Sequence, residues 1–283
     1  MDTFQNKVAV ITGGASGLGL AMAGRFAREG MKLVLADIEE TPLQRAVGEF
    51  VARGTPAIGV KTDVSKAQDV EALADQAYDT YGGVHVLCNN AGVAPGGLTW
   101  ESTVPDWEWC LGVNVWGVIH GLRSFVPRML KQTGPCHIVN TASVAGLLSP
   151  PGMAIYCVSK HAVVTLSECL YQDLSKTGPH IGVSVLCPAY VPTGISDSER
   201  NRPEALKNPP QERSAEQIAR DERLRHAVQS GRISADQVAD KVFESVRGKR
   251  FYILTHEKIK GAIEARMKDI LEGRNPTDTF KPR

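Results

Sequence analysis

The sequence lacks long apolar runs and any strong excess of one charge. In its 283 residues, 32 Lys and Arg face 31 Asp and Glu, so the formal net charge is +1. This balance gives no electrostatic reason to expect nucleic acid or an anionic membrane as a partner. No apolar run reaches the roughly 18 residues of a membrane span, and the first residues lack the basic-then-apolar pattern of a signal peptide. We therefore expect a cytoplasmic protein that binds neither nucleic acid nor membrane.

Paired cysteines and clustered histidines are also missing. The six cysteines are dispersed without a CxxC pair, and most of them stand inside apolar runs. Such cysteines are typical of reduced, buried thiols in a cytosolic protein. The seven histidines form no HExxH or similar motif, so we expect no metal site.

What the chain does contain is a regular alternation of short β-branched runs and helical stretches. Strand, helix and strand with short connections are typical of parallel pairing. The pattern predicts a single α/β domain over residues 1–283, with a doubly wound, Rossmann-type parallel sheet of about seven strands. The predicted strands are 7–12, 32–36, 57–62, 84–88, 137–141, 181–187 and 251–255. The predicted helices are 18–29, 42–53, 65–81, 107–131, 156–175, 214–230, 234–246 and 257–272.

Local signals refine these helices. Capping boxes are expected at the helix starts Ser65/Gln68, Ser214/Gln217 and Ser234/Gln237. Pro127 should bend or break the long fourth helix, because proline lacks the N–H that a helix interior needs. The last predicted helix lies in a C-terminal helical tail, residues 256–283.

Tyr156 and Lys160 stand four residues apart in a helical stretch, so their side chains should share one face, roughly 5 to 6 Å apart at Cβ. A phenol with a pKa near ~10 is a poor base, and a neighbouring ammonium favours its ionised form. Tyr156 would then serve as a proton acceptor or donor. A bare YxxxK also occurs by accident as an exposed helical pair, so its interpretation depends on the motifs around it.

A glycine-rich turn follows the first strand. Gly13, Gly17 and Gly19 give TGxxxGxG, although the literal GxGxxG spacing is absent. Glycines there allow close approach to a pyrophosphate, which a helix N-terminus stabilises through its free amides and dipole. The place of the turn after the first strand favours a nucleotide site over a simple turn.

Two acids follow the next two strands. Asp37 can accept hydrogen bonds from the adenosine ribose hydroxyls and would repel the 2′-phosphate of NADP, with no Arg or Lys in the turn or beside Asp37 to compensate. The alternative is a helix cap before Glu39 and Glu40. Asp63 would receive the adenine amino group or cap the next turn. We predict NAD as the cofactor.

At this point the chain resembles the classical short-chain dehydrogenase/reductase family. The motifs occur in family order: TGGASGLG at 12–19, Asp37, Asp63-Val64, NNAG at 89–92, Asn114, Ser143, YCVSK at 156–160 and PAYVPT at 188–193. The resemblance implies that Tyr156 is the general acid/base and that Lys160 lowers its pKa and holds the nicotinamide ribose. It also implies that Ser143 orients the substrate oxygen and that Asn114 positions a proton-relaying water. By chemistry alone, Ser143 could be a turn residue and Asn114 a satisfied buried amide.

The same resemblance implies a full cofactor site. Its residues are Thr12, Gly13, Ser16, Gly17, Leu18, Gly19, Asp37, Ile38, Asp63, Val64, Asn90, Ala91, Gly92, Tyr156, Lys160, Pro188, Ala189, Val191 and Thr193. The chain departs from the family where Ala189 replaces the usual glycine after Pro188, and Cys88 stands before NNAG in place of an apolar residue.

Apolar residues follow the catalytic motifs. Val144, Leu147, Met153 and Tyr190 are expected to contact substrate, or else to pack against the sheet. They predict a small, neutral, hydrophobic secondary alcohol or ketone. The runs HIVNTASVAGLL, VSVLCP and ISDSERNRP resemble a bacterial branch that acts on bulky aryl secondary alcohols. The polar stretch 193–232 is then a substrate lid or a solvated loop.

These observations predict an NAD-dependent secondary alcohol dehydrogenase, or the reverse ketone reduction. The family resemblance also implies a homodimer or homotetramer. Two alternatives stay open: an NADPH-dependent carbonyl reductase, against which Asp37 argues, and a regulator that senses NAD without turnover, against which Ser143, Tyr156 and Lys160 argue.

Overall fold

The computed structural model describes residues 3–209 and 214–278, in which seven strands form one sheet. The strands are β1 (Val8–Thr12), β2 (Lys32–Asp37), β3 (Ala57–Lys61), β4 (Val86–Asn89), β5 (Cys136–Thr141), β6 (Ile181–Cys187) and β7 (Tyr252–Leu254). Their order is β3-β2-β1-β4-β5-β6-β7, and every neighbouring pair is parallel. The order reverses between β1 and β4, which leaves a crevice at the carboxyl ends of the strands. The predicted doubly wound, Rossmann-type sheet is confirmed.

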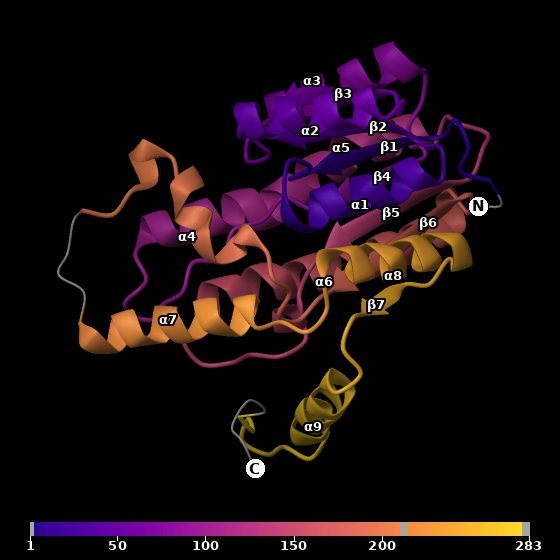
Figure 1. Cartoon of the computed structure of the whole chain (residues 1–283). Coiled ribbons are helices and arrows are strands. Elements are labelled where there is room, and N and C mark those ends of the chain that lie inside the picture. Colours follow the sequence, from indigo (N-terminus) through magenta and orange to yellow (C-terminus); the bar gives the residue numbers. More distant parts are fainter. Residues whose placement is uncertain (1–2, 210–213, 279–283) are drawn as a thin grey trace.

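Helices cover both faces of this sheet. The α-helices are α1 (Gly17–Arg28), α2 (Glu40–Ala52), α3 (Ala67–Tyr81), α4 (Val104–Leu111), α5 (Gly117–Met129), α6 (Ala154–Thr177), α7 (Ala215–Gln229), α8 (Ala235–Gly248) and α9 (Ile259–Leu271). Side chains of α1, α2 and α8 form one core with the sheet, and those of α3, α5 and α6 form the other. Figure 1 shows α1 and α8 side by side against the sheet. No helix among the described residues is long and apolar enough to cross a membrane.

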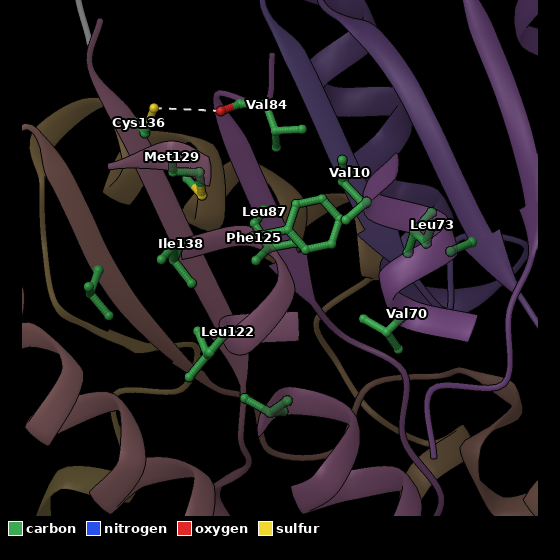
Figure 2. Close-up of a cluster of buried hydrophobic side chains, with 14 of the residues drawn as sticks. Val10, Val70, Leu73, Val84, Leu87, Leu122, Phe125, Met129, Cys136 and Ile138 are labelled. Atoms are coloured by element: carbon green, nitrogen blue, oxygen red, sulfur yellow. Dashed lines mark hydrogen bonds between the residues drawn. The ribbon is translucent and has the colours of Figure 1, made fainter. Parts of the chain in front are cut away.

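The two cores follow from the alternation of side chains along each strand. In β1, Val8 and Val10 point into the core with α3, α5 and α6, whereas Ala9 and Ile11 point into the other. A strand buried on both faces is nearly all apolar, as β1 is from Val8 to Ile11. Figure 2 shows the aromatic ring of Phe125 from α5 next to Val10 and Leu87, in the core that α3, α5 and α6 form with the sheet.

The predicted helix 107–131 is two helices joined by a π-helical turn. Helix α4 begins earlier than expected, because Thr103 and Asp106 form a capping box with Asp106 Oδ2 accepting from Thr103 N–H at 2.8 Å. The π-helical turn (Gly112–Trp116) then leads into α5. Helix α5 continues past Pro127 to Met129, so Pro127 does not break the helix, and a bend there stays a prediction. The irregularity lies at the π-helical turn, a feature frequent at functional sites.

The expected capping box at Ser65 is also wrong. Ser65 donates from both its N–H and its hydroxyl to Asp63 Oδ1, at 3.1 and 2.6 Å. Because Ser65 donates to the Asp63 carboxylate, it does not cap the helix, and α3 begins at Ala67 with Lys66 as its N-cap. The other two capping boxes, at the starts of α7 and α8, are confirmed.

The stretch after β6 contains more structure than the sequence indicated. It holds two 3-10 helices, Gly194–Asn201 and Glu204–Leu206, followed by α7. Residues 210–213 of the predicted lid and residues 279–283 of the predicted tail lie outside the described part of the chain. In Figure 1 the last helix, α9, stands apart from the sheet and its covering helices.

Candidate active site

A cavity opens where the strands end, on both sides of the switch point between β1 and β4. Residues at or just after six successive strands contribute to its wall: Gly13, Asp37, Asp63, Asn90, Ser143 and Pro188. The structure therefore brings together the motifs that are dispersed in the sequence. The predicted site residues that line it are Gly13, Ser16, Gly17, Leu18, Asp37, Ile38, Asp63, Val64, Asn90, Ala91, Gly92, Ser143, Val144, Met153, Tyr156, Lys160, Pro188, Ala189, Tyr190, Val191 and Thr193.

Four predicted residues do not line the cavity: Thr12, Gly19, Asn114 and Leu147. Thr12 supports the wall from behind, because its Oγ1 accepts from the backbone N–H of Asn90 at 2.9 Å and of Ala91 at 3.1 Å. Leu147 is partly buried against the hydrophobic core and has no place in the cavity wall.

The glycine turn forms one end of the cavity. Gly17 has φ +51, in the left-handed region that favours glycine, and a Cβ at Gly19 would stand 2.0 Å from the carbonyl oxygen of Gly13. The turn can therefore close tightly only without side chains at these positions. Helix α1 begins at Gly17, and no side chain caps its first amides. A tight backbone cradle with free amide N–H groups fits the pyrophosphate of a dinucleotide.

Asp37 closes the next part of the wall. Its Oδ2 accepts from the N–H of Ala15 and its Oδ1 from the N–H of Glu39, both at 3.1 Å. Burial raises the pKa of this carboxyl, and the two N–H groups oppose that effect. The carboxylate is held in the wall, so it fits the ribose hydroxyls of an adenosine that would lie there.

Asp63 makes local contacts as well as lining the cavity. Its Oδ1 accepts both hydrogen bonds from Ser65, and its other oxygen lies 3.4 Å from Lys66 Nζ. These bonds match the alternative in which Asp63 caps a turn. A contact with adenine stays a prediction.

Tyr156, Lys160 and Ser143 meet in the middle of the cavity. Tyr156 and Lys160 project from the first turns of α6, and the Lys160 ammonium lies 5.7 Å from the centre of the Tyr156 ring. Lys160 is 3% exposed and donates to the carbonyl of Thr141 at 2.9 Å. Ser143 follows β5, hydrogen-bonds with Tyr156, and donates to the carbonyl of Pro188 at 3.3 Å. The shared helix face predicted for Tyr156 and Lys160 is present.

The pKa of Tyr156 differs from the expectation. Burial raises it to about 12, although the hydrogen bond with Ser143 lowers it. The ammonium of Lys160 bonds to Thr141 and not to the phenol, and burial lowers its own pKa to about 8. Tyr156 and Lys160 are both shielded from water, so burial favours the neutral form of each side chain. The lower pKa expected for Tyr156 rested on the neighbouring charge alone, whereas burial disfavours the phenolate and raises the pKa.

Asn114 lies within the π-helical turn and is fully buried. Its Oδ1 accepts from the N–H of Val93, and its Nδ2 donates to the carbonyl of Val93, both at 2.9 Å. Nδ2 also donates to Ser159 Oγ at 3.0 Å. Asn114 therefore fixes the loop after β4 against α6, and its role in a water relay stays a prediction.

The end of the cavity beyond Tyr156 is apolar. Besides the predicted Val144, Met153 and Tyr190, it is lined by Val93 and Ala94, which directly follow the NNAG motif as expected for pocket residues. The wall also contains Trp109, Val113, Pro150, Ile195, Leu224 and Val228. Trp109 and Val113 are four apart on a helical stretch, so their shared face was readable from the sequence. Leu224 and Val228 of α7 are also four apart on a predicted helix, but only the tertiary fold carries that helix over the cavity.

No Arg or Lys stands in the glycine turn or beside Asp37 in the sequence, but the fold brings one into the same cavity. Arg200, 163 positions later in the 3-10 helix Gly194–Asn201, lines the same cavity as Asp37 and Glu39. Its Nε and Nη2 donate to the two carboxylate oxygens of Glu39 at 3.1 and 2.8 Å. The local sequence around Glu39 or Arg200 does not predict this contact, because the two residues are 161 positions apart.

Comparisons with known proteins agree with this geometry. The family model described as short chain dehydrogenase matches residues 7–204. A CLA biosynthesis dehydrogenase/reductase from Lactiplantibacillus plantarum is 34% identical over 96% of this chain and 95% of that protein. A C alpha-dehydrogenase from Sphingobium sp. is 31% identical over 99% of this chain and 90% of that protein. A crystal structure of a short chain dehydrogenase/reductase from Burkholderia phymatum in complex with NAD is 55% identical, with a TM-score of 0.97 over 100% of both chains.

Proposed function

The chain belongs to the short-chain dehydrogenase family of oxidoreductases, and we propose that it is an NAD-dependent dehydrogenase of hydrophobic secondary alcohols. The observation that carries the proposal is the meeting of Tyr156, Lys160 and Ser143 in one cavity with the glycine turn and Asp37. A nucleotide cradle and a proton-transfer group are then within reach of one bound substrate. The reverse reaction, reduction of a ketone, uses the same groups.

The proposed chemistry divides the work between cofactor and protein. When bound, the dinucleotide supplies the hydride acceptor. The hydroxyl of Tyr156 exchanges the proton with the substrate oxygen, and Ser143 donates a hydrogen bond that orients the same oxygen. A protonated Lys160 favours the phenolate during alcohol oxidation. Because the pKa of Tyr156 is raised to about 12, its protonated form suits proton donation to a ketone at neutral pH.

The apolar end of the cavity supports the proposed substrate class. Among the described residues, the wall of this end includes Trp109, Val144, Met153 and Leu224 and contributes no Arg or Lys that could hold a carboxylate or phosphate. The substrate is therefore a neutral alcohol or ketone, and a bulky aryl secondary alcohol suits the aromatic and aliphatic side chains. The name of the Sphingobium relative, C alpha-dehydrogenase, is consistent with this class.

A substrate screen tests the proposal. Hydrophobic secondary alcohols, aryl carbinols among them, are incubated with NAD or NADP while the absorbance of the reduced nicotinamide is followed. We expect turnover with NAD and a lower kcat/KM with NADP. Tight binding of NADH without turnover of any alcohol or ketone would favour the sensing regulator, and a higher kcat/KM with NADP would favour the carbonyl reductase.

Residues 193–232 form a lid over the substrate in this proposal. Support comes from Ile195 and Leu224, which line the cavity, and from the ion pair between Arg225 and Asp197 at 3.1 Å, which ties α7 to the preceding 3-10 helix. Limited proteolysis should cut this segment more slowly when NAD and substrate are both present. Equal cutting with and without them would contradict the lid.

We also propose that the chain assembles as a homodimer or homotetramer through α5 and α6. Large apolar side chains are exposed on α6 and on the π-helical turn that leads into α5: Trp116 is 50%, Val158 49% and Tyr171 45% exposed. Light scattering coupled to gel filtration should give two or four times the chain mass of 30.6 kDa. A single chain mass at micromolar concentration would contradict the assembly.

A further inference from the structure

Arg200 is bound at the adenosine end of the cavity by more than one group. Besides the two bonds to Glu39, its Nη1 donates to the carbonyl oxygens of Gly194 and Asp197, at 3.3 and 2.9 Å. All three guanidinium nitrogens are therefore engaged. The last two bonds lie within the 3-10 helix that carries Arg200, so they would hold the side chain in place without Glu39.

Asp37, Glu39 and Arg200 line the part of the cavity where the adenosine ribose would lie. Asp37 is 8% exposed and held by backbone N–H groups, whereas the side chains of Glu39 and Arg200 are 25% and 42% exposed. The side chain of Asn201 also hydrogen-bonds with Glu39. The local net charge is negative, so a 2′-phosphate on the adenosine ribose would meet repulsion. Among the described residues that line this end of the cavity, Arg200 is the cation that could bind it, and Arg200 is already paired bidentately with Glu39.

We propose that Glu39 is a specificity-determining residue that excludes NADP by occupying Arg200. The inference rests on the proposed function only in that the cavity binds a dinucleotide. Asp37 repels a 2′-phosphate directly, and Glu39 acts by a separate route, because it takes up the Nε and Nη2 donors of Arg200. Without Glu39 these two donors face the cavity on a guanidinium that Gly194 and Asp197 still hold, and this fork fits a phosphate.

Binding measurements on a double-mutant cycle test this proposal. Isothermal titration calorimetry gives the affinities of NADH and NADPH for the wild type, E39A, R200A and E39A/R200A. We expect E39A to bind NADPH at least about tenfold more tightly than the wild type, with NADH affinity changed less than about threefold. R200A should change NADPH affinity less than about threefold in the wild type, but should abolish the gain in the E39A background.

Glu40 supplies the matched control. It stands next to Glu39 but pairs with Lys61 at 3.0 Å and does not line the cavity. Glu40→Ala removes the same charge without freeing Arg200, so it should change NADPH affinity less than about threefold. An equal gain in E39A and E39A/R200A, or in E40A, would overturn the proposal, because charge removal alone would then explain it.

The readout separates this inference from the proposed reaction. A protein that binds NADH and shows the expected cycle but oxidises no alcohol would overturn the catalytic proposal and support the role of Glu39. A protein that oxidises alcohols with NAD but gains no NADPH affinity in E39A would support the catalytic proposal and overturn the role of Glu39. Both side chains are partly exposed, so the variants should fold normally.

Discussion

Replacing Lys160 with methionine should stabilise the fold while abolishing catalysis. Burial lowers the pKa of Lys160 from 10.5 to about 8. At about 1.4 kcal/mol for each pKa unit, this drop makes the folded charged form about 3 kcal/mol less stable than a charged lysine in water. Methionine keeps the apolar stem and removes that cost, but it loses the hydrogen bond to the Thr141 carbonyl, worth about 1 kcal/mol. The free energy of unfolding should rise by about 2 kcal/mol at pH 7.

The increase in the free energy of unfolding caused by Lys160→Met should become smaller as the pH rises. Below pH 8 the lysine is protonated in both the folded and the unfolded chain, so the full penalty applies to the wild type. Between pH 8 and 10.5 the folded wild type releases its proton before the unfolded chain does, so the free energy of unfolding rises with pH. The advantage of Lys160→Met over the wild type should therefore disappear near pH 10.

Urea denaturation at pH 7 and pH 10, at one fixed protein concentration, measures both effects. Lys131→Met is the control, because Lys131 is exposed and should change the free energy of unfolding by less than about 0.5 kcal/mol at either pH. The reasoning is refuted if Lys160→Met is less stable than the wild type at pH 7, or if its advantage is the same at both pH values.

Two further substitutions test the cavity wall and the segment that closes it. Gly19→Ala should weaken NADH binding at least about tenfold, because its Cβ would stand 2.0 Å from the Gly13 carbonyl oxygen. Gly24→Ala in the same helix is the control: its Cβ would meet only the tip of the Arg28 side chain at 4.0 Å, so it should bind NADH as the wild type does in the same calorimetric titration. Arg202→Ala should lower the free energy of unfolding by about 3 kcal/mol in urea, since Arg202 is 4% exposed and pairs with Asp106 at 2.5 Å. A cost below 1 kcal/mol would show that this buried pair does not anchor the segment.

The sequence predicted the sheet well because each strand carries its own signal. Apolar runs such as VAVIT in β1 are buried on both faces, and the turns that follow contain the glycines and polar residues of the cavity. Asp37 and Ser143 follow parallel strands that end at the same edge of the sheet, whereas the grouping of Ser143 with Tyr156 in one site was predicted from the family resemblance.

What the sequence could not give depends on contacts between distant segments or on burial. Arg200 meets Glu39 across 161 positions of the chain, and no local pattern encodes that pairing. The error at Ser65 is local instead: its hydroxyl bonds to the Asp63 carboxylate two residues away, a competing partner that the capping-box pattern does not consider. The pKa of Tyr156 is set mainly by the surroundings that exclude water from the phenol, which a four-residue spacing does not reveal.

The central claim is that Tyr156 transfers the proton in a hydride-transfer reaction. The most direct measurement compares kcat for the best alcohol in the wild type, Tyr156→Phe and Tyr171→Phe, with NADH affinity measured on the same samples. Tyr171 lies exposed on the same helix, so its variant should match the wild type. We expect Tyr156→Phe to lose at least about a hundredfold in kcat while binding NADH within about threefold of the wild type. Turnover by Tyr156→Phe within about tenfold of the wild type would contradict the claim.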